Sequence, residues 1–446
     1  MQQLDLTSAH ASKGFDFALL GVPPHLQVFE PTHAAALKRL ATVKPAQYAR
    51  SRNALDGAVT GLSPYFTHGL LRMDEAAKSI HQRNPLSFED KLVFEFAWRE
   101  FFHHVWSRAA NQGDAILRDM HGELPWHGQY ANELPPDIRE GRTGVAVIDN
   151  AVRILYASGY LHNHMRMYLA SYVVHVRKVH WRAGADWLYG HLLDGDLASN
   201  HLSWQWVAAT FSSKPYLFNA ENVARYAPSS ARRAWDCSGT VIDQSYEALD
   251  VLARQRGDAG AERGQHDGIT EPALLPLPYE SFDAVAQSER AQAAINNVAI
   301  NITNNMANNA ATSARIELVQ PFDLSARQPA GAGVNNSGGA LRIGVIHTPA
   351  HAMWPWSEQR WRFVLAAMAD VTDAIWVGDI AQLQLPEGAQ VSAQATLFPG
   401  YREALARKAR LQPAPHLLPN PSMACRSFSK FYERARRDVA QFADLL

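Results

Sequence analysis

The sequence has few cysteines and almost no net charge. Only Cys237 and Cys425 occur in 446 residues, so the chain has neither a disulfide framework nor a CxxC metal or redox motif. This cysteine usage fits a reducing compartment, and we expect a cytoplasmic protein. The 42 Lys and Arg residues nearly balance the 43 Asp and Glu residues, so composition alone gives no sign of a nucleic-acid partner.

Long apolar segments and several common motifs are also absent. No apolar run reaches about 18 residues, and the N-terminus lacks the basic and apolar regions of a secretory signal, so we expect no membrane association. GxGxxG, GxxxxGK[ST] and HExxH do not occur. His162 and His164 are two residues apart, so on a helix their side chains would diverge by about 200° and could not bind one metal ion. In a calcium loop that begins at Asp194, Ser199 and Gln205 stand where the loop needs Gly and Glu. We therefore expect no metal site.

Apolar residues make up 47% of the chain, enough for a large core and more than one domain. Residues 1–28 have no clear period and are interpreted as an irregular leader. From 29 to 228, apolar residues recur at spacings of three and four, which predicts a mainly α, all-helical domain. The predicted helices cover 31–41, 69–81, 88–111, 144–158, 161–180, 184–193 and 196–209.

The composition changes in the second half of the chain. We interpret 229–340 as an extension followed by a flexible or poorly packed linker, because 283–340 is rich in Ala, Asn, Gln and Ser. A linker at this place would mark a domain boundary. Residues 341–446 are expected to form a small α/β unit. Its strand, helix and strand are predicted at 341–348, 358–370 and 373–378.

Two segments place a set of chemically distinct side chains on one helical face. Their shared spacing of i, i+3 and i+4 makes the three side chains of each set point together. A surface ion pair beside a core tryptophan is the better explanation of the first set when it is taken alone. The two sets are Glu95, Trp98 and Arg99, and Asn163, Arg166 and Met167.

An acidic turn, Asp194-Gly195-Asp196, precedes a predicted helix that carries Asn200, Trp204 and Trp206. Carboxylates, an amide and indoles in this order suit a planar aromatic ligand that forms hydrogen bonds. A capping aspartate followed by core tryptophans is the alternative, and the turn alone does not decide between the two.

The order of these segments resembles the flavin-binding catalytic domain of the DNA photolyase and cryptochrome superfamily, especially the photolyases that repair cyclobutane pyrimidine dimers. The resemblance covers about 200 residues. The matching segments are Tyr48-x-x-x-Arg52, Thr60-Gly61-Leu62-Ser63-Pro64-Tyr65 with Gly69, Trp98-Arg99-Glu100-Phe101, Glu140-Gly141-x-Thr143-Gly144 with Asp149, His162-Asn163-x-x-Arg166-Met167, Asp194-Gly195-Asp196-Leu197-Ala198-x-Asn200, and Trp204-Gln205-Trp206.

The resemblance implies FAD as cofactor and a role for each matching residue. FAD would be bound by Tyr48, Thr60, Leu62, Ser63, Arg99, Arg166, Asp194, Asp196 and Asn200. Arg166 would pair with Asp194 beside the flavin ring. The pocket for a flipped dinucleotide would be lined by the catalytic residues Glu95, Trp98, Asn163, Met167 and Trp206, with Arg52, Glu95, Trp98 and Trp206 contacting DNA. Electrons would reach the flavin along a chain of aromatic residues. Its first two members would be Trp204 and Trp181, and its distal member would be Trp126 or Tyr130.

The implied function is light-driven repair of cyclobutane pyrimidine dimers by a carbon-carbon lyase, with UV-damaged DNA as partner. Unpaired or single-stranded DNA should be the easier substrate, because flipping a base from a duplex costs a few kcal/mol. The alternative is a blue-light photoreceptor that repairs nothing and uses residues 229–446 to engage a protein partner of unknown identity.

The sequence departs from the family pattern in three places. The family carries an α/β antenna domain before the catalytic domain, whereas about 28 residues precede it here, so we expect no second chromophore. The distal tryptophan expected near Gly128 is absent, which is why Trp126 or Tyr130 is assigned that step. His164 replaces a residue that is usually basic on the DNA side.

Overall fold

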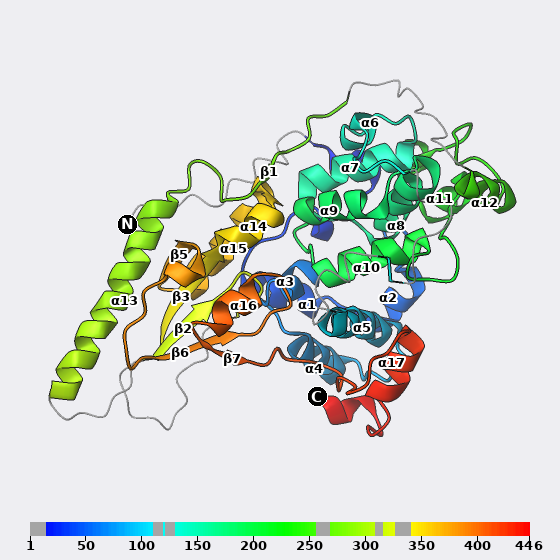
Figure 1. The fold of residues 1–446 in the computed structure, drawn as a ribbon. Coiled ribbons are helices and arrows are strands. Elements are labelled where there is room, and N and C mark those ends of the chain that lie inside the picture. The colour runs from blue at the N-terminus through cyan, green and yellow to red at the C-terminus, as the bar shows by residue number, and fades with distance from the viewer. Residues whose placement is uncertain (1–14, 110–118, 121–129, 256–267, 308–314, 326–339) are drawn as a thin grey trace.

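The computed structural model describes residues 15–109, 119–120, 130–255, 268–307, 315–325 and 340–446. The chain folds into a helical region and an α/β unit that lie side by side (Figure 1). The fold is therefore not purely helical, and the α/β unit expected from the sequence is present. Buried apolar side chains form one cluster that continues from the helical region into the sheet.

The helical region follows the apolar periodicity of the sequence. Thr32 caps its first helix by accepting a hydrogen bond from the Ala35 N–H, and Gly159 ends a later one with a φ of 66°. Its helices are α1 (His33–Ala41), α2 (Pro45–Ser51), α3 (Ser63–Thr67), α4 (Met73–Arg83), α5 (Lys91–Ala109), α6 (Pro136–Arg139), α7 (Ala146–Ser158), α8 (Asn163–Ser171), α9 (Trp181–His191), α10 (Leu197–Ala208), α11 (Ala220–Tyr226) and α12 (Tyr246–Arg254).

One prediction in this region needs correction. The helix predicted over 161–180 stops at Ser171 and continues as a π-helical turn, Tyr172–Val176. The described part of the leader contains short 3-10 turns at Phe17–Leu20 and Pro24–Leu26 and packs onto the core. The indole of Trp235 fixes it by donating a hydrogen bond to the Leu20 carbonyl at 3.0 Å.

The α/β unit is built on a five-stranded parallel sheet of order β5-β3-β2-β6-β7. The earliest strand in sequence, β2, lies at its centre, and later strands add first on one side and then on the other. This is a doubly wound order, and its direction reverses between β2 and β6. The strands are β2 (Arg315–Val319), β3 (Leu341–His347), β5 (Ala374–Gly378), β6 (Gln390–Gln394) and β7 (Arg410–Gln412).

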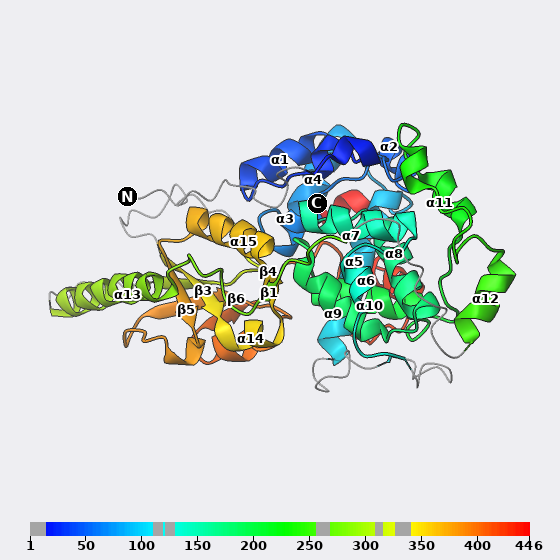
Figure 2. The same ribbon diagram turned by 90° about the horizontal axis from the view of Figure 1, so that it is seen from above.

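The remaining elements frame this sheet. Helix α15 covers the sheet beside β3, and α13 lies along β5 (Figure 2). A two-stranded antiparallel pair, β1 (Leu274–Leu275) and β4 (Trp356–Ser357), lies where the two parts of the molecule meet. The helices are α13 (Ala284–Ala307), α14 (Thr348–Met353), α15 (Glu358–Val371), α16 (Tyr401–Ala406) and α17 (Phe428–Ala435), with 3-10 turns at Arg232–Trp235, Ile380–Gln382 and Phe442–Leu445.

The interpretation of 283–340 as a flexible or poorly packed linker is wrong for two of its segments. Residues 284–307 form α13, and Ser288 on this helix hydrogen-bonds both the N–H and the carbonyl of Val377 in β5, at 2.9 and 3.0 Å. Residues 315–319 form the central strand of the sheet. The α/β unit therefore begins before residue 341.

The C-terminal segment returns to the helical region and packs on α5, as Figure 1 shows for α17. The buried carboxylate of Glu100 accepts hydrogen bonds from the N–H groups of Leu417 and Leu418 at 2.6 and 2.9 Å. One turn further along α5, His104 accepts from the Cys425 N–H at 3.0 Å. The two parts of the chain therefore do not separate at a linker.

Candidate functional site

A cavity of about 290 Å³ opens in the helical region, lined mainly by α5, α8 and α10. It brings together most of the residues singled out in the sequence, although they come from five separate segments. The sequence-predicted residues that line it are Tyr48, Thr60, Ser63, Glu95, Trp98, Arg99, Asn163, Arg166, Met167, Asp194, Asp196, Asn200 and Trp204.

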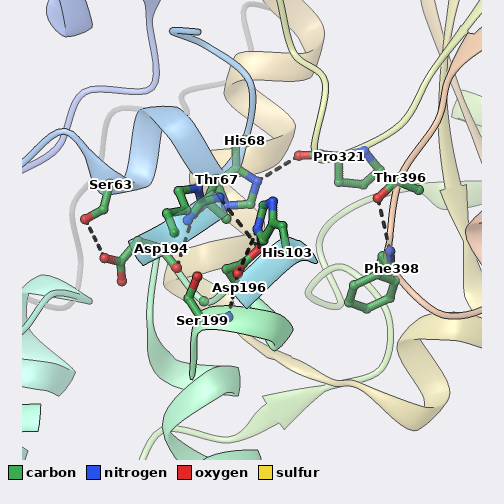
Figure 3. Close-up of polar contacts among 12 residues, drawn as sticks. Ser63, Thr67, His68, His103, Asp194, Asp196, Ser199, Pro321, Thr396 and Phe398 are labelled. Carbon is green, nitrogen blue, oxygen red and sulfur yellow. Dashed lines mark hydrogen bonds and ion pairs between the residues drawn. The ribbon is translucent and has the colours of Figure 1, made fainter. Parts of the chain in front are cut away.

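The ion pair expected between Arg166 and Asp194 is present on one wall of this cavity. Nη2 of Arg166 lies 3.0 and 2.8 Å from the two carboxylate oxygens, and its Nε donates to the Leu161 carbonyl at 2.9 Å. The hydroxyl of Ser63 donates to the same carboxylate at 2.5 Å, and that of Thr67 donates to the Asp194 carbonyl (Figure 3). Asp194 is thus a buried anion with several donors around it.

Asp196 does two things at once. Its carboxylate caps α10 by accepting from the Ser199 N–H at 2.8 Å, and it also faces His103 Nε2 at 3.0 Å and Arg99 Nη2 at 3.6 Å. Burial opposes ionisation, but His103, Arg99 and the hydrogen bonds hold the pKa of Asp196 well below its usual range. The capping interpretation of the acidic turn is correct, and this does not remove the carboxylate from the cavity wall.

The residues expected to face a substrate line the same cavity, except Trp206. Nε of Arg52 lies 4.0 Å from Glu95 Oε1, and the amide of Asn163 donates to the Met167 sulfur at 3.3 Å. The indole of Trp98 stacks on the ring of Phe428 with centroids 4.1 Å apart and planes 6° apart. Phe428 belongs to α17, so the C-terminal segment supports one face of this tryptophan.

Several predicted residues lie outside the cavity lining. Leu62 is completely buried before α3, Trp206 lies on the surface of α10 with 37% of its area exposed, and Arg52 is at the side of Glu95. Trp181 is buried and donates to Asp119 at 2.5 Å, and Tyr130 is also buried. Trp126 lies outside the described residues.

The residues missed in the sequence include three that contact Asp196 or the segment around it, namely His103, His68 and Arg360. His103, which contacts Asp196, is four positions after Arg99 and so on the same helical face, a signal that could have identified it. His68 and Arg360 contact the acidic turn through backbone carbonyls. Such contacts leave no spacing pattern, so sequence alone gave no means of finding them.

Residues 92–257 match the family model described as the FAD binding domain of DNA photolyase. This region is an FAD-binding domain of the photolyase and cryptochrome superfamily. Within this photolyase-type domain lie α5, α7, α8 and the acidic turn, whereas α2 and Ser63 precede the matched residues. The resemblance noted in the sequence is thereby confirmed.

Relatives of the photolyase-type domain carry matching names. The deoxyribodipyrimidine photo-lyase of Synechococcus sp. is 30% identical over 226 residues, covering 48% of this chain and 45% of the relative. One from Thermus thermophilus is 36% identical over 187 residues, covering 41% of this chain and 44% of the relative. A Synechocystis cryptochrome of known crystal structure is 21% identical, with a TM-score of 0.43. The match covers 54% of this chain and 56% of the cryptochrome. The chain spans about half the length of the relatives that it matches.

Two further findings concern the described part of the chain. Its His, Cys, Asp and Glu residues form no group of three or more that could hold a metal ion, and both cysteines are free and buried. None of its helices combines the length and apolar character needed to cross a membrane.

Proposed function

We propose that this protein binds FAD and repairs cyclobutane pyrimidine dimers in DNA with blue light. The observation that supports this proposal is a single cavity whose lining combines two sets of residues. One set is the Arg166–Asp194 ion pair with Asp196. The other set is Glu95 and Trp98, together with Asn163 and Met167.

The Arg166–Asp194 ion pair and Asp196 fit a flavin nucleotide. The cavity combines aromatic and apolar surfaces with a few convergent polar groups, as cofactor sites do. Arg166 and Asp194 would flank the isoalloxazine ring, while Tyr48, Thr60 and Ser63 would contact the phosphates. Asn200 donates its amide to the Ala185 carbonyl at 2.8 Å, which fixes the side chain, and this neutral group would contact the N5 edge of a bound flavin. Such an amide tolerates an anionic reduced flavin.

The chemistry of the repair belongs mainly to the cofactor. Reduced FAD, when bound and excited by light, supplies the electron that splits the cyclobutane ring and accepts it back. The side chains of this chain hold the two partners in place. Glu95 would accept hydrogen bonds from a base edge, Trp98 and Trp206 would stack on the flipped pair, and Arg52 would contact the DNA.

The choice of lesion rests on Asn163 and Met167. Repair of the (6-4) photoproduct needs proton transfer, for which the family places histidines at these two positions. Neither an amide nor a thioether titrates near neutral pH, and here the two side chains contact one another. Splitting a cyclobutane dimer needs no proton transfer, so this pair favours cyclobutane dimers as the substrate.

The proposal extends to partners and location. DNA binding should weaken with salt, because phosphate contacts supply much of the affinity, and unpaired DNA should be the easier substrate. We further propose a cytoplasmic protein in which FAD is the only chromophore. An excitation spectrum of repair that follows flavin absorption alone would support that view, and a stoichiometric second chromophore would contradict it.

The experiment that tests the proposal uses purified protein with reduced flavin and an oligothymidylate that contains dimers. Under blue light, absorbance at about 260 nm should recover as intact stacked bases return. Glu95→Gln should slow this recovery without removing FAD. Flavin that binds and photoreduces normally without any dimer repair would favour the photoreceptor alternative, and protein that binds no FAD would contradict both functions.

A further inference from the structure

A buried arginine from the α/β unit lies directly behind the acidic turn of the photolyase-type domain. Arg360 on α15 has none of its area exposed. Its Nη1 donates to the Tyr189 carbonyl at 2.9 Å, and its Nη2 donates to the Gly195 carbonyl at 2.6 Å. The guanidinium also lies over the rings of Trp356 and Tyr189, at 4.1 and 4.7 Å from their centroids. Two carbonyls and two aromatic rings therefore fix its position.

Gly195 is the residue between the two carboxylates of the cavity wall, and its backbone is pressed against this guanidinium. A Cβ atom at Gly195 would lie 2.3 Å from Arg360 Nη1 and 2.5 Å from the Tyr189 carbonyl oxygen, so glycine alone fits. Because the side chains on either side of a fixed peptide are directed by it, the contact with Gly195 sets where Asp194 and Asp196 point. The arginine itself does not line the cavity.

The charge of Arg360 is unusual for a buried position. Among the described residues it forms no ion pair within 4.0 Å, although Asp194 and Asp196 both act on it electrostatically. Burial lowers the pKa of the guanidinium, yet arginine starts so high that it stays protonated at neutral pH. An isolated buried cation is costly, and its placement behind two anions offsets that cost.

A second contact holds the start of the same turn to the α/β unit. His68 is completely buried, with Nε2 at 2.8 Å from the Leu193 carbonyl and Nδ1 at 2.7 Å from the carbonyl of Pro321, which follows β2 (Figure 3). Burial and then the Arg360 cation lower the pKa of His68 to about 3, so the ring is neutral and its single N–H donates to one of the two carbonyls. The α/β unit therefore contacts this segment directly at Gly195, through Arg360, and packs its Pro321 carbonyl against His68.

We propose that Arg360 is a positioning residue of the FAD site, so that the α/β unit forms part of that site without touching the cofactor. This inference rests on the proposed binding of FAD in the cavity. Arg360 would hold the Asp194-Gly195-Asp196 turn in its binding geometry, and its positive charge would favour the more negatively charged, reduced form of the flavin.

A purely structural role makes a different prediction. Arg360→Met leaves the Tyr189 and Gly195 carbonyls without their donor, which lowers the free energy of unfolding whatever the role. If the role is purely structural, FAD affinity and midpoint potential should stay near the wild-type values in the protein that remains folded. The positioning role instead predicts that FAD affinity falls even where the apoprotein remains folded.

The test compares Arg360→Met and Arg360→Lys with a matched control, Arg362→Met. Arg362 is on the same helix, two residues away, where it pairs with Glu358 at the surface. Each protein is purified without FAD and its fold is checked by circular dichroism and urea unfolding. The dissociation constant of FAD and the midpoint potential of the bound flavin are then measured.

We expect Arg360→Met to raise the FAD dissociation constant at least about tenfold and to make the midpoint potential more negative, while Arg362→Met matches the wild type. Arg360→Lys keeps the charge but cannot span both carbonyls, so it should weaken FAD binding several-fold and preserve the potential. Should the methionine variant not fold, the lysine variant alone carries the test.

Wild-type affinity and potential in Arg360→Met would overturn the inference, as would wild-type affinity in Arg360→Lys. A lysine variant whose potential shifts as far as that of the methionine variant would show that the charge plays no part, and would also overturn it. A wild-type protein that binds no FAD is a different result, because it removes the proposed function itself.

Discussion

The helical region and the α/β unit contribute to one site in different ways. The helical region presents side chains to the cavity, such as Arg166 and Asp194, at spacings that are visible in the sequence. The α/β unit presents none, but Arg360 donates to the Gly195 carbonyl behind the turn, and the Pro321 carbonyl contacts His68 beside it. Side-chain chemistry can therefore be found by motif, whereas the backbone contacts that orient it cannot.

This comparison predicts that replacing a residue that faces the cavity lowers FAD affinity more than replacing a residue that lies behind the turn. Arg166→Ala leaves the buried carboxylate of Asp194 unpaired, and breaking a buried ion pair costs about 3 to 5 kcal/mol. FAD affinity should fall about 100-fold or more, well beyond the effect of Arg360→Met. Equilibrium dialysis measures both, with the exposed Arg225→Ala as control. Equal losses of FAD affinity in the two variants would contradict this prediction.

A second prediction concerns the electron path within the helical region. Trp204 is buried at the cavity and packs against Gly184, so Phe fills most of its volume while removing the indole donor. Trp204→Phe should lose most flavin photoreduction and keep its FAD content. Time-resolved absorption after a light pulse measures the rate, with Trp187→Phe as a buried control away from the cavity. An unchanged rate in Trp204→Phe would show that another donor operates.

A third prediction tests whether the two regions unfold together. Phe428 stacks on Trp98 and contacts Phe94, so Phe428→Ala should lower the free energy of unfolding by about 2 to 3 kcal/mol. Because the core is continuous, circular dichroism and tryptophan fluorescence should follow one urea transition. Ser429→Ala, on the exposed side of α17, is the control. Two separate transitions would mean that the regions are less coupled than their contacts indicate.

The smallest expected effect is a pH dependence of stability. Burial raises the pKa of Glu100 to about 7, against the opposing effect of the Leu417 and Leu418 N–H groups and of Arg99. The folded state therefore holds a proton that the unfolded chain releases near pH 4.5, and this contribution to stability is lost as pH rises through 7.

Glu100→Gln should flatten this dependence, with a difference between the variant and wild type that changes by about 1 to 3 kcal/mol from pH 5 to pH 8. Urea unfolding across that range measures the slope. The nearby His416, 3.9 Å from Glu100, also titrates, so His416→Gln is the matched control. A wild-type slope retained in Glu100→Gln would assign the pH dependence to another group.

The helices were predictable where apolar residues repeat on one face. Predictions at 144–158 and 358–370 agree with α7 and α15 to within two residues. The same logic failed for β2 and α13, because a five-residue strand is too short to establish a period and an Ala- and Asn-rich helix resembles a linker in composition. The partners that define these elements lie far away in the sequence.

The site was predictable to the extent that it is made of side chains in local patterns. Arg166 and Asp194 pair as the resemblance implies, and Asp196 joins them at the cavity. Trp206 was expected beside them but lies on the surface of α10, since two positions along a helix turn a side chain by about 200° from Trp204. Its assignment to the substrate pocket remains a proposal.

The hydrogen bonds of Glu100 and His104 on α5 with the C-terminal segment also have a consequence for the order of folding. Glu100 and its partner Leu417 are separated by 317 positions, so the part of α5 that the C-terminal segment covers stays exposed until a much later part of the chain has been synthesised. Contacts this distant in sequence slow folding, because a long loop must close before they form. A nascent chain would meanwhile expose the apolar side of α5, and should depend on chaperones until Leu417 arrives.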